Sequence, residues 1–161
     1  MARASERKPN IRVFLDIRGF SGNPSRITEL LGIEPDESWS KGDIVPAKFV
    51  SGRVIYDKSK SIKRKYSCWT IRASLKKYSF NMEDYIKDII KKIAPVRNKF
   101  KKLPKSVNLM LCVWIDIYSP KESAPSLGLS IETMKFLSSI NATLDIDISF
   151  VLSDRLQAVF K

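Results

Sequence analysis

The sequence predicts an α+β domain in which helices pack on one face of a mixed, largely antiparallel sheet. Apolar and polar residues alternate over 11–17 and over 107–117, which is the two-residue period of half-buried strands. Between these segments, 82–93 carries apolar residues at the spacing of a helix with one buried side. We therefore expect the element order β-α-β-β-β-α-β-α-β.

The N-terminal part is predicted to form a strand and a short helix after a polar tail at 1–9. The strand covers 11–18. Asn23–Pro24 offers a helix start, and Gly32 offers the stop.

A long connection is expected next, over 34–46. It contains Trp39, which we expect to plug the edge of the core, and a turn at Gly42. A hairpin with strands 47–50 and 53–57 should follow.

A basic loop, 58–65, is predicted to lead into a strand over 66–75 that places Trp69 on the apolar face. The best helical pattern then begins near Asn81 and is ended or kinked by Pro95.

The remaining elements are a second short helix, a long strand, a helix and a final strand. The second short helix carries Val96, Phe100 and Leu103, and the long strand covers 107–118. Ser130 should cap the last helix, and 143–150 should be the last strand. The apolar stripe expected on that helix consists of Ile131, Met134, Leu137 and Ile140.

Length and composition favour a single domain over 10–152 with a C-terminal extension at 153–161. No segment has the apolar length of a membrane span, and the first residues lack the apolar core of a secretory signal, so we expect a cytoplasmic protein. The two cysteines, Cys68 and Cys112, have neither CxxC spacing nor a histidine to join them, and we expect them in the core or on a sheet face.

The chain contains no histidine, which removes the usual general base and the commonest transition-metal ligand. A cofactor is not expected, because no glycine-rich phosphate-binding motif occurs. The enzyme alternative is a metal-dependent hydrolase built on sheet-face aspartates. They are Asp16, Asp116, Asp145 and Asp147.

The second face of the sheet is predicted to collect arginines, aromatic residues and acids. Its members are Arg12, Phe14, Asp16, Arg18, Tyr66, Cys68, Thr70, Arg72, Met110, Trp114, Asp116, Tyr118, Asp145 and Asp147. One interpretation is a stacking platform for single-stranded nucleic acid. The interpretation that we favour is a face of cross-strand Arg–Asp and aromatic pairs, either solvated or forming a homodimer.

Two stretches, 48–66 and 87–105, carry +6 and +7 respectively, and the remaining residues sum to −1, which gives the net charge of +12. Such a localised positive field favours polyanions and acidic partners, although it is also compatible with a solvated surface. The candidate binding residues are basic side chains of these stretches together with one strand arginine. They are Lys58, Lys60, Lys63, Arg64, Lys65, Arg72, Lys99, Lys101 and Lys102.

Several short motifs carry a resemblance to a known family. They are Leu31–Gly32–Ile33–Glu34–Pro35, Trp39, Lys41–Gly42–Asp43, Trp69, Gly128–Leu129–Ser130 and Leu144–Asp145–Ile146–Asp147. The chain resembles the bacterial domain-of-unknown-function family four-two-seven-nine from about Ile11 to Phe150. The resemblance implies an α+β fold and a bacterial cytoplasmic setting, without an assigned activity. We assign structural roles to Trp39, Gly42, Trp69 and Gly128.

The sequence therefore predicts a non-enzymatic interaction module whose basic surface engages an acidic protein or nucleic acid. The alternatives are an immunity-type inhibitor of a toxin and the metal-dependent hydrolase described above. A membrane partner is not expected.

Overall fold

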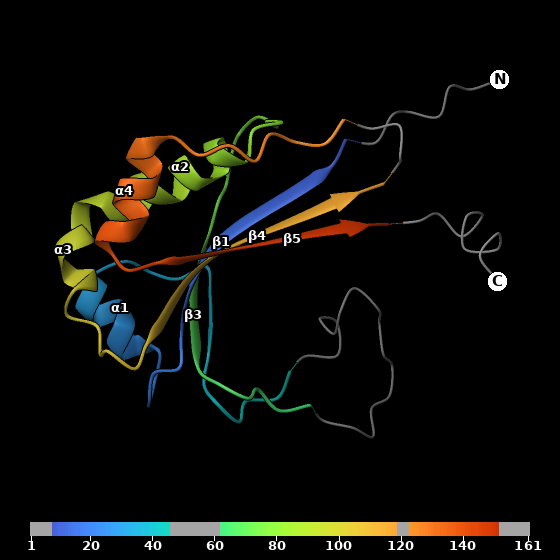
Figure 1. Ribbon diagram of the computed structural model, residues 1–161. Coiled ribbons are helices and arrows are strands. Elements are labelled where there is room, and N and C mark those ends of the chain that lie inside the picture. The colour runs from blue at the N-terminus through green and yellow to red at the C-terminus, as the bar shows by residue number, and fades with distance from the viewer. Residues whose placement is uncertain (1–7, 46–61, 119–122, 152–161) are drawn as a thin grey trace.

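The computed structural model describes residues 8–45, 62–118 and 123–151, and in that part five strands form one sheet with helices on one of its faces (Figure 1). The elements are β1 (Asn10–Arg18), α1 (Ser25–Leu31), β2 (Glu37–Trp39), β3 (Cys68–Arg72), α2 (Met82–Ile93), the 3-10 helix η2 (Ala94–Val96), α3 (Arg97–Phe100), β4 (Asn108–Ile117), α4 (Ile131–Ser139) and β5 (Thr143–Phe150).

The sheet has the order β2-β3-β1-β4-β5, with β1 at its centre. β1 is antiparallel to β3 and β4, β2 is antiparallel to β3, and β5 runs parallel to β4. The predicted α+β class and the mixed, largely antiparallel sheet are thus confirmed. The predicted hairpin strands 47–50 and 53–57 lie outside the described residues.

One strand arises where a connection was predicted. β2 lies within 34–46, where Asp36 fixes it to β3 through two hydrogen bonds. The Asp36 amide donates to the Thr70 carbonyl at 2.9 Å, and the Asp36 carboxylate accepts from the Arg72 amide at 2.7 Å. This three-residue edge strand is too short to leave a periodic signal in the sequence.

The core lies between the helices and the aliphatic face of the sheet. Leu15 and Ile17 of β1, Leu111 of β4 and Ile86 of α2 are fully buried and belong to one apolar cluster. Trp69 of β3 is also fully buried, and its indole Nε1 donates to the hydroxyl of Thr28 in α1 at 3.0 Å. Burial of each such large apolar side chain stabilises the fold by about 1.5–3 kcal/mol.

The starts of α2 and α4 predicted from capping residues are confirmed, whereas α1 has Pro24 at its cap position, one residue after the expected Asn23. The Asn81 side chain accepts from the Glu83 amide at 3.1 Å, and α2 ends before Pro95, where η2 and α3 follow. Ser130 caps α4 by accepting from the Thr133 amide at 3.3 Å.

A buried carboxylate joins α2 to the start of α4. The Glu83 carboxylate accepts from the Ser130 hydroxyl at 2.5 Å, the Thr133 hydroxyl at 2.6 Å and the Ser130 amide at 2.7 Å. These hydrogen bonds, with that of the Ser130 hydroxyl contributing most, lower the pKa of Glu83 to about 2. Glu83 is therefore ionised at neutral pH and fastens α4 to α2.

Of the four apolar residues expected on the helix that begins after Ser130, two are buried and two are exposed. Leu137 and Ile140 are buried, but Ile131 and Met134 are 61% and 49% exposed. The polar residue Thr133 is buried in their place because its hydroxyl faces Glu83, and this contact sets the rotation of the helix.

Candidate functional site

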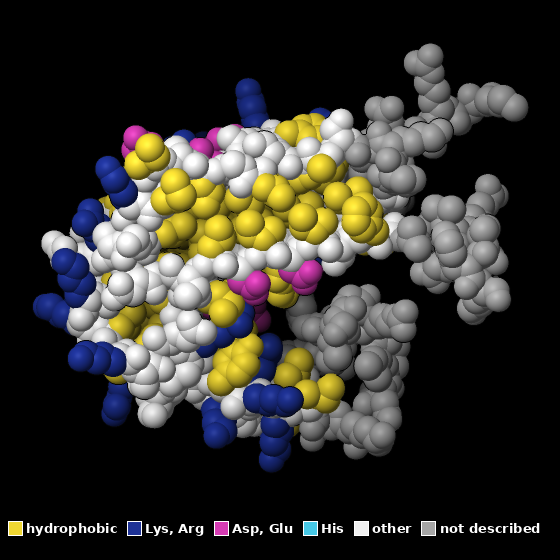
Figure 2. All heavy atoms as spheres, in the orientation of Figure 1, with side chains coloured by type: hydrophobic (Ala, Val, Ile, Leu, Met, Phe, Trp, Pro, Cys, Tyr) yellow, Lys and Arg dark blue, Asp and Glu magenta, His cyan; other side chains and the backbone are white. Residues whose placement is uncertain are grey.

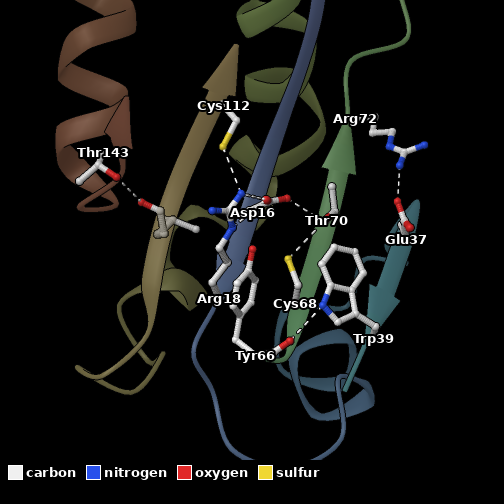
Figure 3. A network of polar contacts seen from close by, with 11 residues as sticks. Asp16, Arg18, Glu37, Trp39, Tyr66, Cys68, Thr70, Arg72, Cys112 and Thr143 are labelled. Atoms are coloured by element: carbon white, nitrogen blue, oxygen red, sulfur yellow. Dashed lines mark hydrogen bonds and ion pairs between the residues drawn. The ribbon is translucent and has the colours of Figure 1, made fainter. Parts of the chain in front are cut away.

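The open face of the sheet carries a network of paired polar groups around Asp16 (Figure 3). The buried Asp16 carboxylate accepts from Arg18 Nε at 2.9 Å and from the Thr70 hydroxyl at 2.7 Å. Burial of Arg18 disfavours its charge, but the hydrogen bond and the negative charge of Asp16 outweigh this effect and raise the pKa of the guanidinium. Asp16 and Arg18 thus form an ion pair between two residues of β1.

Both cysteines lie buried on this face, as predicted. Burial and the nearby charge of Asp16 raise the pKa of Cys68 to about 11 and that of Cys112 to about 12. Because the thiolate is the reactive form, these thiols are poor nucleophiles at neutral pH.

The aromatic residues of the open face are engaged with arginines and with each other. The Arg12 guanidinium lies 5.2 Å from the centre of the Trp114 ring and pairs with Asp116 at 2.8 Å. Phe14 meets Trp114 edge to face at 4.7 Å. The cross-strand pairs of our favoured interpretation are therefore present.

A further group of pairs occupies the β2 side of the open face. The Arg64 guanidinium lies 3.9 Å from the centre of the Trp39 ring, and the Trp39 indole donates to the Tyr66 carbonyl at 3.0 Å. The prediction that Trp39 plugs the core is wrong. Trp39 stands opposite Cys68 in the β2–β3 ladder, and residues paired in this way share a face, which is here the open one.

The four sheet-face aspartates do not cluster. Asp16 and Asp116 belong to separate ion pairs, whereas Asp145 and Asp147 lie exposed on β5. Within residues 8–45, 62–118 and 123–151, no three Asp, Glu, Cys or His residues come together in a way that could hold a metal ion. The metal-dependent hydrolase alternative therefore lacks the cluster on which it depends.

Part of the predicted basic loop is paired backbone. Ile44 and Lys63 form a β-bridge, and the amides of Gly42 and Val45 donate at 2.8 Å to the carbonyls of Arg64 and Ile62 respectively. Residues 42–45 and 62–65 thus form a two-stranded ribbon, with Gly42 at a φ of 95°, where glycine is favoured. Lys58 and Lys60 lie outside the described residues.

Three of the candidate binding residues have partners within the fold. Lys99 Nζ donates at 3.0 Å to the carbonyl of Leu31 at the end of α1, where a cation is favourable. Arg72 pairs with Glu37, and Arg64 lies 3.8 Å from the same carboxylate. Lys99, Arg64 and Arg72 are therefore engaged within the fold itself.

The two basic stretches meet at one end of the sheet. The Gly19 amide, just after β1, donates to the Ser67 carbonyl at 3.2 Å, and the Ser106 carbonyl lies 3.6 Å from where a Cβ of Gly19 would be. Lys65 and Lys105, each close in sequence to one of these serines, are therefore brought to opposite sides of Gly19.

We call the two segments that reach Gly19, 62–67 and 101–106, the basic end. The exposed lysines in these segments are Lys63, Lys65, Lys101, Lys102 and Lys105. The ion pairs among the described residues involve none of these five side chains. Lys and Arg side chains project along the left and lower margins of Figure 2. Sequence reasoning had not singled out Lys105, because the contact of its segment with Gly19 depends on how the strands of the sheet are arranged.

The remaining structural candidates differ in what they do. Trp69 has the buried position and hydrogen bond described above. Gly128 has an ordinary φ, and a Cβ there would meet only the Ser126 hydroxyl at 3.8 Å, so nothing in its surroundings requires glycine.

These features define a small α+β domain with an open-faced, five-stranded sheet. The model of the family described as Domain of unknown function (DUF4279) matches residues 9–151, and the chain belongs to this family. The resemblance noted in the sequence is thereby confirmed. Searches of curated proteins and of solved structures found no match. In the described part of the chain, every helix is too short or too polar to cross a membrane.

Proposed function

We propose that the protein is a non-enzymatic binding module whose basic end engages an acidic macromolecule, either nucleic acid or an acidic protein surface. The observation that carries this proposal is the contact of Gly19 with Ser67 and Ser106, which brings the segments that contain Lys65 and Lys105 to either side of Gly19. Exposed lysines from two distant stretches add their fields at one place, which attracts and orients polyanions.

The open sheet face supports a binding role over a catalytic one. Asp16 and Asp116 are held in ion pairs, and burial keeps the two thiols protonated. Ion pairing and burial thus engage these groups in the structure, and of the four sheet-face aspartates only Asp145 and Asp147 lie outside the ion pairs of the described residues.

The test compares the parent with a variant carrying Lys63→Ser, Lys65→Ser and Lys105→Ser. A fluorescein-labelled 20-base-pair DNA duplex is titrated with each protein at several salt concentrations. If each lysine neutralises one phosphate, the log–log salt slope should fall by about 0.9 per lysine removed. In parallel, pull-down from nuclease-treated bacterial lysate examines acidic proteins as partners.

A second lysine cluster provides a matched control. Lys76, Lys77 and Lys91 line one shallow pocket beside α2, and their replacement by Ser removes the same three charges. We expect this control to retain most of the binding. Equal loss in both triple variants would show that net charge alone acts, and no loss in either experiment would show that the three lysines of the basic end do not contribute to binding. Either result would refute the proposal.

A further inference from the structure

The apolar side chains of β5 lie largely uncovered. Leu144, Ile146, Ile148 and Phe150 each stand opposite a buried aliphatic residue of β4, so they share the helix-side face. They are nevertheless 38%, 37%, 42% and 67% exposed, respectively. Figure 2 shows apolar side chains as a continuous band over β5. The apolar face of the sheet thus extends beyond the helices that cover the rest of it.

Among the strands of the described residues, β5 is the last in the sheet, so no described strand pairs with its outer edge. The Val151 amide donates to the Ile117 carbonyl of β4 at 2.8 Å. Because successive peptide groups alternate along an unbroken ladder, the amides of the odd-numbered residues from Thr143 to Ser149 also face β4. The amides and carbonyls of the even-numbered residues, Leu144 to Phe150, therefore point outward.

The opposite face of β5 is acidic. Asp145 and Asp147 are exposed there, next to Cys112 and Trp114 of β4. Neither carboxylate belongs to an ion pair of the described residues. A chain with a net charge of +12 thus presents two adjacent unpaired acids on its sheet edge.

We propose that the outer edge of β5 is a docking site for an extended peptide segment of a partner protein in which aliphatic residues alternate with Lys or Arg. The segment adds a strand to β5 by bonding to the outward amides and carbonyls. Its aliphatic side chains continue the apolar stripe, and its cations face Asp145 and Asp147. This site is separate from the basic end and does not depend on it.

Charge complementarity selects this occupant over a second copy of the chain. Two β5 edges joined together would gather four aspartates on one face, and like charges across neighbouring strands are destabilising. A segment with alternating cations instead pairs each carboxylate.

The probe is an acetylated, fluorescein-labelled peptide of four Lys-Val repeats, titrated into the full chain at 0.15 M salt and followed by anisotropy. We expect the double variant Asp145→Lys, Asp147→Lys to weaken binding by roughly tenfold, because two favourable cross-strand pairs are lost. The Asn double variant at the same positions should show a smaller loss. A Lys-Ser peptide should not bind, because it cannot continue the apolar stripe.

The matched control carries Glu29→Lys and Glu34→Lys, two exposed acids away from β5, and makes the same change in net charge. If binding depends on pairing of the peptide's lysines with Asp145 and Asp147, this control should bind the peptide within about twofold of the parent affinity. Equal weakening in this control would overturn the proposal.

Amide hydrogen exchange locates the bound peptide. The outward amides of Ile146 and Ile148 should exchange quickly in the free chain and slow down when the peptide binds, whereas the Asp147 amide should be protected throughout. Three results would overturn the proposal. They are no peptide binding, edge amides already protected in the dilute free chain, and protection that rises with protein concentration alongside a dimer in sedimentation.

Discussion

Replacing Glu83 with Gln removes the charge that fastens α4 to α2 while keeping one acceptor oxygen. The hydroxyls of Ser130 and Thr133 and the Ser130 amide lower the pKa of Glu83 from 4.5 to about 2. Because a tenfold change in proton affinity corresponds to about 1.4 kcal/mol, the ionised form contributes at most about 3 kcal/mol to stability. We expect Glu83→Gln to lower the free energy of unfolding by about 2 kcal/mol at pH 7.

The pH dependence gives the sharper test. A carboxylate whose pKa is lowered by folding stabilises the native state fully above its unfolded pKa, and this contribution is lost as the pH falls through the folded pKa. The stability difference between the parent and Glu83→Gln should therefore be constant above about pH 5 and shrink steadily towards pH 2. Urea unfolding followed by tryptophan fluorescence at pH 7, 5, 4 and 3 measures this difference.

Glu132→Gln is the matched control for this prediction. Glu132 lies in the first turn of α4, and its side chain is exposed. Glu132→Gln should therefore lower the free energy of unfolding by less than about 0.5 kcal/mol. A Glu83→Gln deficit that does not change between pH 7 and pH 3, or an equal deficit in the control, would refute the role assigned to the buried carboxylate.

Three further predictions concern the core, the thiols and a helix end. Trp69→Phe should cost about 2 kcal/mol in urea unfolding, because it leaves a cavity and breaks the hydrogen bond to α1. A loss below 0.5 kcal/mol would contradict that packing. Cys68 and Cys112, with pKa values raised by burial, should resist a disulfide reagent at pH 8 until the chain unfolds, and rapid native labelling would be inconsistent with this burial. Gly32→Ala should lower stability by about 1 kcal/mol because φ is 71° there, whereas Gly128→Ala should be nearly neutral, and thermal melting compares the two.

Local patterns were sufficient to predict the long elements of the fold. β1, β4 and α2 each carry an apolar period along their whole length, and Asn81 and Ser130 mark helix starts through side chains that bond within a few residues. Information of this kind is contained in neighbouring residues, so the sequence alone reveals it.

Features that depend on contacts between distant residues could not be predicted in the same way. Trp39 lies on the open face because β2 pairs with β3, and Thr133 is buried because Glu83 lies across from it. Lys99 looked like a surface cation, yet it bonds to α1. In each case the partner is many residues away in the sequence, so the pattern of neighbouring residues does not predict the contact.

The same limit applied to the candidate site. The two basic stretches were evident from composition, but their meeting around Gly19 required the register of the sheet. The exposure of β5 was equally hidden, since its alternating pattern is that of any half-buried strand.

The central position of β1 has a consequence for biosynthesis. This strand leaves the ribosome first, yet its neighbour β4 follows much later, since Asn10 and Asp116 are 106 residues apart. During translation, the edge of β1 that pairs with β4 therefore stays unpaired until most of the chain has been made. Such long-range pairing slows folding and exposes the nascent protein to aggregation, so chaperones that bind nascent chains should associate with its early segments during translation.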